Sequence, residues 1–182
     1  QGIYSTIKIK RISFSERRVD LEKDFSLFFN NSVVDFLKGT DYLVLGVVTI
    51  GNILEEKISE YFSQGEYPRA VSLDAVGTVA VGNLSRDIRS LVCQEAKEHN
   101  FKTTRYFSPG YGDWDISQQK NIFEIIPACK IGAKLTNSFM MVPKKSSSWV
   151  IGIGKNITMP SKDDNSCKIC KAMKCQFKKI FN

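Results

Sequence analysis

YLVLGVVTI, residues 42–50, is a continuous stretch rich in β-branched residues and predicts a buried strand. Gly51 follows it, and Asn52 is a candidate N-cap for an amphipathic helix that reaches about Ser63. Because the stretch does not alternate between apolar and polar residues, we expect both faces of this strand to be covered.

A second, much longer helix is predicted from Tyr67 to about His99. Small residues are scattered through it, and they allow another backbone or a ligand to approach closely. Since glycine also weakens a helix, we expect a break or bend near Gly82-Asn83.

Shorter elements flank this central part of the chain. The patterns predict strands at residues 3–9, 102–106 and 149–153, an extended segment at 138–143, a polar turn at 144–148, and helices at 32–38 and 118–126. Residues 11–24 are highly charged and predict a loop or the start of a helix, and Ser117 is the expected N-cap of the helix that follows it. Strands and helices in this irregular order favour an α+β fold with an antiparallel or mixed sheet.

The composition is that of an ordinary globular protein, with 182 residues, 42% hydrophobic and 25% charged. We expect one domain over residues 1–155 and a basic, cysteine-containing tail over residues 156–182. No apolar run of membrane-spanning length and no signal-peptide core is present, so we expect a cytoplasmic protein that does not enter a membrane. The odd number of cysteines, five, also fits a reducing compartment.

The net charge of +7 is concentrated at the two ends of the chain. Residues 155–182 hold seven lysines and two aspartates, whereas the central part is close to neutral. A nucleic-acid interface would be a basic stripe with interleaved aromatic residues, so we expect no nucleic-acid partner. The basic tail is either solvated or docks on an acidic partner.

Catalytic motifs are missing from the sequence. It has no GxGxxG, Walker A, GxSxG or HExxH pattern, and His99 is its single histidine. No pair of carboxylates stands out for acid–base chemistry. A self-contained hydrolase is therefore disfavoured, and binding, or catalysis by a bound cofactor or partner, is favoured.

The segment RYFSPGYGDW, residues 105–114, predicts a shaped loop. Pro109 fixes φ, and Gly110 and Gly112 permit positive φ. Arg105 offers a planar guanidinium suited to a carboxylate or phosphate, and the aromatic residues, Tyr111 among them, offer faces for a flat or cationic ligand. The alternative interpretation is a surface turn whose aromatic side chains cap the core.

Three cysteines, Cys167, Cys170 and Cys175, lie within nine residues of the tail. They predict a Zn or iron–sulfur site that takes a fourth ligand from Cys93, Cys129, a water or a second chain. The alternative is three free thiols.

Several motifs resemble the activation (reactivation) domain of cobalamin-dependent methionine synthase, as a short stand-alone protein. They occur in the family's order over about residues 40–154. The matching segments are GVVTIG at 46–51, LDAVG at 73–77, RYFSPGYGDW at 105–114, QKNIFE at 119–124 and KLTNSFMMVP at 134–143.

The resemblance implies a bent antiparallel sheet with flanking helices. It also implies a site for S-adenosylmethionine and a partner protein that carries cobalamin or another corrinoid. In the family, S-adenosylmethionine supplies a methyl group and a redox partner supplies an electron, and together they restore methylcobalamin from inactive cob(II)alamin. This chain has neither the family's cobalamin-binding Asp-x-His-x-x-Gly segment nor its methyltransferase barrels. It is at most an accessory part of such a methyltransferase system.

By resemblance, Arg105 clamps the methionine carboxylate, Tyr111 packs on the ribose or adenine, and Glu98 meets the amino group. The loop residues Ser108, Pro109, Gly110 and Gly112 complete the expected site, with glycine amides free for the adenine edge. One residue more than is usual in the family separates Arg105 from the Gly-Tyr pair, so either the arginine is displaced or the loop bulges.

Three functions follow from these patterns. The first is an S-adenosylmethionine-binding activation module that serves the corrinoid of a separate protein, with an electron donor as a further partner. The second is a non-catalytic adaptor that docks a corrinoid protein. The third is a small metal or iron–sulfur redox protein that uses the cysteine tail.

Overall fold

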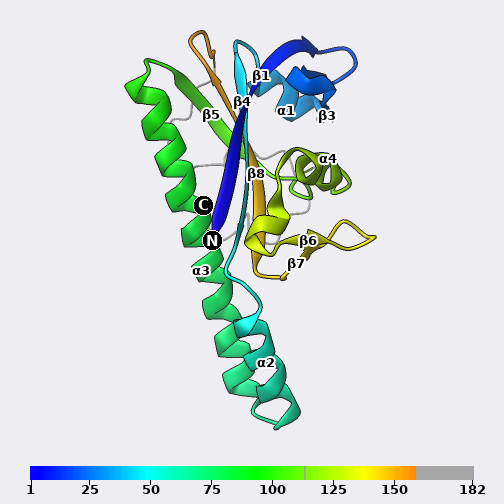
Figure 1. The fold of residues 1–182 in the computed structure, drawn as a ribbon, viewed down its shortest axis with the longest axis vertical. Helices are drawn as coiled ribbons and strands as arrows, with labels where there is room; N and C mark the ends of the chain where they lie inside the picture. Colours follow the sequence, from blue (N-terminus) through cyan, green and yellow to red (C-terminus); the bar gives the residue numbers. More distant parts are fainter. Residues whose placement is uncertain (113, 159–182) are drawn as a thin grey trace.

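The computed structural model describes residues 1–112 and 114–158. A six-stranded sheet with the order β3-β2-β1-β4-β8-β5 forms its centre, and every neighbouring pair is antiparallel (Figure 1). The strands of this sheet are β1 (Gly2–Ser13), β2 (Arg18–Leu21), β3 (Ser26–Phe28), β4 (Tyr42–Thr49), β5 (Lys102–Phe107) and β8 (Ser146–Gly154). The α+β class and the antiparallel sheet predicted from the sequence are therefore confirmed.

Four α-helices, two 3-10 helices and a small two-stranded sheet complete the described chain. The helices are α1 (Asn31–Phe36), α2 (Ile53–Ser63), α3 (Tyr67–Glu98), α4 (Gln118–Ile125), η1 (Glu22–Asp24) and η2 (Ala128–Ile131). The small sheet pairs β6 (Lys134–Leu135) with β7 (Met141–Val142). Figure 1 shows α3 along one face of the large sheet, and α1, α4 and the small sheet on the other.

The sheet bends along β1. The first part of this strand pairs with β4, and from Ile9 onward it pairs with β2. The register shifts between Ile9 and Arg11, and such an irregularity bends a strand. Figure 1 shows the far end of β1 turning toward α1.

Strand β4 is buried on both faces, as its unbroken apolar sequence predicts. Leu43, Leu45 and Val47 join the larger core cluster, which includes residues of α1 and α4, whereas Val44 joins a smaller cluster with residues of α3. A half-exposed strand would have alternated with polar residues, so the absence of alternation reflects the two-sided burial.

A close contact between β4 and β8 holds this centre together. Gly46 pairs directly with Trp149, whose fully buried indole ring covers the glycine. A Cβ atom on Gly46 would collide with that ring. Glycine at this position therefore leaves the space that the largest side chain of the core needs.

Helices α2 and α3 form a hairpin that extends past the end of the sheet (Figure 1). Lys145, just before β8, ties the hairpin to the sheet, because its Nζ lies 2.8 Å from an oxygen of Asp74 and donates to Thr78 Oγ1 at 2.8 Å. Its backbone N–H also donates to Glu55 of α2 at 3.0 Å. The LDAVG segment at 73–77 thus includes a structural anchor, Asp74.

Three local expectations were wrong. Helix α3 is continuous through Gly82-Asn83, because buried Val81 and Ser85 on either side pack the helix against the rest of the protein. Residues 11–24 hold the end of β1, strand β2 and η1 rather than a loop or helix start. Residues 146–148 belong to β8, where buried Ser148 donates to Gln119 Oε1 at 2.7 Å, so their polarity reflects internal hydrogen bonds.

Among residues 1–112 and 114–158, no helix is both long enough and apolar enough to cross a membrane.

Two glycine substitutions test the account of the core and of α3. Gly46→Ala inserts a methyl group under the Trp149 ring and is expected to lower the free energy of unfolding by about 1–3 kcal/mol. Gly82→Ala meets nothing within 4 Å and is expected to raise it by about 0.5–1 kcal/mol, since alanine suits a continuous helix better. Urea unfolding measures both, and a loss of stability in Gly82→Ala would mean that α3 does not run straight through this position.

Candidate functional site

Strand β5 contains a bulge at the arginine that the sequence singles out. Thr103 pairs with Ile153 and Tyr106 pairs with Ile151, so Thr104 and Arg105 both lie opposite Gly152. The buried Thr104 side chain supplies hydrogen bonds where the pairing of β5 with β8 is irregular. Its Oγ1 accepts the Gly152 N–H at 2.9 Å and donates to the carbonyl of Arg105 at 2.8 Å.

The bulge decides which face of the sheet Arg105 occupies. Tyr106 lies on the α3 side, where the guanidinium of Arg89 is 3.7 Å from its ring centre. Arg105 lies on the opposite side, with its guanidinium 4.7 Å from the ring centre of Phe36 and 5.2 Å from that of Phe107. Strict alternation would have placed Arg105 and Phe107 on the same face as Thr103, toward α3. The bulge lies before the stretch that separates Arg105 from the Gly-Tyr pair, in which Tyr106 and Phe107 pair regularly with Ile151 and Val150.

Arg105 is held by aromatic rings but lacks hydrogen-bond acceptors. Its Nε and Nη1 atoms are buried, and no acceptor for either lies within the described residues. Leaving donors of a charged group buried and unpaired costs at least about 1–3 kcal/mol. This arrangement suits an anionic group that arrives from outside the chain.

The loop after β5 is a compact double turn. Tyr111 N–H donates to the Ser108 carbonyl at 3.2 Å, with Pro109 and Gly110 (φ +85°) between them, as in a type II β-turn. A second hydrogen bond, from Trp114 N–H to the Tyr111 carbonyl at 3.3 Å, continues the turn. The Tyr111 side chain is 79% exposed at this turn, on a backbone that its own hydrogen bonds fix.

Trp114 anchors the loop to the body of the protein. Its ring is buried and stacks on Phe29 with 4.8 Å between ring centres, and its Nε1 donates to the Phe28 carbonyl at 2.7 Å. Its own carbonyl accepts the Gly110 N–H at 2.8 Å. Of the aromatic residues in the loop, Trp114 is therefore structural, as the alternative interpretation of the sequence holds, whereas Tyr111 is not.

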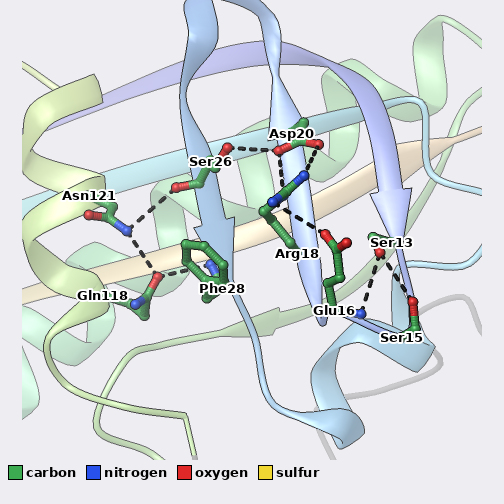
Figure 2. Close-up of polar contacts among 9 residues, drawn as sticks. All are labelled: Ser13, Ser15, Glu16, Arg18, Asp20, Ser26, Phe28, Gln118 and Asn121. Atoms are coloured by element: carbon green, nitrogen blue, oxygen red, sulfur yellow. Dashed lines mark hydrogen bonds and ion pairs between the residues drawn. The ribbon is translucent and has the colours of Figure 1, made fainter.

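Helix α4, which follows the loop, is hydrogen-bonded to the edge strand β3. Figure 2 shows Gln118 Oε1 accepting the Phe28 N–H at 2.9 Å and the Asn121 side-chain amide at 3.1 Å. Asn121 also reaches the Ser26 carbonyl at 3.5 Å. On the adjacent strand, Asp20 accepts from Ser26 Oγ at 2.7 Å (Figure 2). These contacts fix the loop at both ends.

The start of α4 is stabilised by Asp115 rather than by the expected cap. The Ser117 side chain makes no capping bond, and Asp115 Oδ1 accepts the Ser117 N–H at 2.7 Å. Hydrogen bonds from the Ser117 side chain and N–H hold the pKa of the Asp115 carboxyl below its ordinary value. Asn52, the expected N-cap of α2, likewise forms no side-chain capping hydrogen bond.

The predicted site residues are only partly brought together. Arg105 and the loop from Ser108 to Gly112 form one continuous strand and turn. Glu98 lies instead at the end of α3, on the other face of the sheet from Arg105, where it is exposed and accepts from Gln94 at 3.1 Å. The expectation of a free glycine amide was wrong at Gly110, whose N–H is used by Trp114.

The predicted cysteine site, Cys167, Cys170 and Cys175, lies outside the described residues. Of the two other cysteines, Cys93 is half-buried and Cys129 is exposed, and both are free thiols. Within residues 1–112 and 114–158, no group of three or more His, Cys, Asp or Glu side chains is arranged to hold a metal ion.

Sequence reasoning missed Phe36, the ring that holds Arg105 from α1. In the sequence, Phe36 is one of several apolar residues in a short helix, and nothing distinguishes it from a core residue. Its role depends on α1 lying beside β5, which only the fold reveals.

The residues present fit the carboxylate end and the flat rings of S-adenosylmethionine. The unpaired donors of Arg105 suit a carboxylate, and the exposed Tyr111 ring suits a ribose or adenine. An acid for the amino group is not supplied by Glu98 in this arrangement.

A pair of glycine variants tests the loop. Gly110→Ala places a Cβ 2.8 Å from Ile116 Cδ1 at a positive φ, whereas Gly112→Ala has positive φ (+66°) but open space. Each variant is expected to lower the free energy of unfolding by about 1 kcal/mol, because alanine disfavours positive φ. Gly110→Ala should lower it by about 1 kcal/mol or more beyond that, because its Cβ collides with Ile116. Equal losses in urea unfolding would contradict the described turn.

A pH titration tests the start of α4. Ser117→Ala removes the side-chain hydrogen bond, so the Asp115 pKa is expected to rise toward its ordinary value, as measured by carbon NMR of the carboxyl group. Because folding lowers this pKa, the carboxylate stabilises the fold above the pKa of the unfolded chain, and this stabilisation is lost as the pH falls through the folded value. The pKa of Asp20, lowered mainly by Ser26, is the control and should not move. An unchanged Asp115 pKa would refute the assignment.

The comparisons with known proteins support the fold. No family model matches the sequence, and no curated protein matches it. Among solved structures, the chain is similar to the crystal structure of the MetH reactivation domain bound to AdoHcy, with a TM-score of 0.69 and 16% sequence identity. The match covers 89% of this chain, which spans 59% of the length of the matched structure. The fold is that of the MetH reactivation domain, and the resemblance seen in the sequence motifs is confirmed at the level of the fold.

Proposed function

We propose that this protein binds S-adenosylmethionine at Arg105 and Tyr111 and serves, as an activation module, the corrinoid of a separate protein. The observation that carries the proposal is the pair of buried, unpaired donors on Arg105, in a fold whose solved relative is bound to AdoHcy. A guanidinium whose neighbours are aromatic rings gains more from a carboxylate than one that is already paired.

Arg105 is assigned to the methionine carboxylate. Phe36 and Phe107 hold the guanidinium and shield it from water, which strengthens its attraction for an anion. Little side-chain ordering remains to be done when the ligand binds, because the arginine already packs beside the two rings, whose centres are 5.7 Å apart.

Tyr111 is assigned to the ribose or adenine. The turn from Ser108 to Tyr111 is closed by its own hydrogen bonds, and Trp114 anchors it, so the exposed ring is presented on a rigid support. An exposed aromatic ring on a fixed turn offers a stacking face at small entropic cost.

The chemistry of the reaction is that of the bound ligand and of the partner. S-adenosylmethionine supplies the methyl group and leaves as S-adenosylhomocysteine, and a donor outside this chain supplies the electron that reduces the corrinoid. The residues of this chain bind and orient the methyl donor. In this proposal the corrinoid belongs to a separate protein.

Isothermal titration calorimetry with S-adenosylmethionine and S-adenosylhomocysteine tests the proposal. The wild type is expected to bind both, and Arg105→Met is expected to weaken binding at least about tenfold, since a charge-assisted pair contributes about 1.5–3 kcal/mol. Because methionine can pack against the two phenylalanine rings without burying a charge, Arg105→Met should unfold at the same or higher urea concentration than the wild type.

Arg69→Met, which removes an exposed arginine paired with Glu66 at 2.6 Å, is the matched control and should leave binding unchanged. No heat from a folded wild type at millimolar ligand would refute the proposal. Normal binding combined with a large loss of stability in Arg105→Met would show that the arginine is structural.

A further inference from the structure

An exposed apolar surface covers the outer side of the first half of α3. Between Arg69 and Arg86 the only charged residue of the helix is Asp74, and this residue is engaged by Lys145. Val71, Val76 and Val79 are 60%, 59% and 62% exposed. A solvated helix normally carries charged residues on its outer side, so this outer surface is unusual for one that stays in water.

The buried side of the same helix segment faces in another direction. Ala70, Gly77 and Val81 are buried, and Gly77 lies against Leu54 of α2. Helical spacing places the exposed valines on the opposite side from these residues. A shallow hollow on that side is lined by Ala75, Val76, Val79, Ala80 and Asn83. We call this surface the outer α3 face.

We propose that residues 167–181 of this same chain dock on the outer α3 face as an amphipathic helix. These residues lie outside the part of the chain that the structure describes. Cys170, Met173, Phe177 and Ile180 recur at spacings of three, four and three, which is typical of one helical side. The opposite side would carry mostly lysines. Such a helix requires an apolar partner surface.

The lengths agree. A 15-residue helix from Cys167 to Phe181 is about 22 Å long, and the 17 steps from Arg69 to Arg86 cover about 25 Å. Lys102, four residues after the end of α3, pairs with Gly154, so the tail starts near the C-terminal end of that helix. From there to Arg86 is about 18 Å along α3, and the eight residues 159–166 span up to about 28 Å.

The two segments have opposite net charge. Residues 159–182 carry six lysines and two aspartates, a net side-chain charge of +4. Residues 53–83 carry five acids and two bases, a net of −3, but three of the acids lie on α2, on the other side of α3 from the outer α3 face, so the apolar match carries the proposal. A short linker keeps the tail at an effective concentration of about millimolar near this surface, which favours docking within one chain over docking between chains.

Docking has a consequence for the cysteines. On a helix, Cys170 lies on the apolar side, whereas Cys175, five residues later, lies on the lysine side. The three thiols then do not converge on one ion. Intramolecular docking and the three-cysteine metal site are therefore mutually exclusive, and one experiment decides between them.

Hydrogen exchange of the full chain, followed by mass spectrometry in reducing buffer with a chelator, tests this inference. In the wild type, the amides of residues 167–181 are expected to exchange at least about tenfold more slowly than in the isolated peptide, at low and high protein concentration alike. This protection should disappear in Val76→Asp/Val79→Asp, which puts two charges on the outer α3 face, and in Met173→Asp/Phe177→Asp, which leaves the described domain untouched. Val142→Asp, at a 46% exposed valine of β7, is the control and should keep the protection.

Several outcomes would overturn the inference. Unprotected wild-type amides would show no docking, and protection that survives in Val76→Asp/Val79→Asp would place the tail elsewhere. Protection that appears only without chelator would indicate the metal site. Protection that rises with protein concentration would indicate docking on a second copy, and protection seen only with anionic vesicles would indicate a lipid surface.

Discussion

The β-bulge at Thr104 and Arg105 is the constraint on which the candidate site depends. It places two successive side chains opposite one residue, Gly152, so that Arg105 points away from α3 and onto Phe36 and Phe107. The Thr104 hydroxyl replaces part of the interrupted ladder through bonds to Gly152 and Arg105. A regular strand would have turned the arginine toward α3, on the other side of the sheet from its present aromatic partners.

Most polar residues of the segments that resemble the reactivation-domain family have structural partners in this chain. Asp74 binds Lys145, Gln119 accepts from Ser148, and Thr136 accepts the Met140 N–H at 3.1 Å. Among the described residues, only Arg105 and Trp149 have buried side-chain donors with neither an acceptor nor an ion-pair partner. Trp149 is fully buried, whereas Arg105 as a whole is only partly buried.

The sequence predicted the central elements well because their patterns are local. The run at 42–50 and the helices at 53–63 and 67–98 follow from burial and helical spacing alone. Non-local features were missed: the bulge depends on pairing with β8, the role of Phe36 depends on α1 lying beside β5, and the continuity of α3 at Gly82 depends on the burial of Val81 and Ser85 on either side. Glu98 was expected at the site as the acid for the amino group of the ligand, but it lies on the opposite face of the sheet from Arg105.

The central claim, that the buried donors of Arg105 await an anionic group, is tested most directly by NMR of the Arg105 side chain. The Nε–H resonance, assigned by its loss in an arginine variant, is followed while S-adenosylhomocysteine is added. The account predicts a downfield proton shift that saturates with ligand, because the donor gains a carboxylate acceptor. An Nε–H resonance that does not move while the ligand binds would contradict the account.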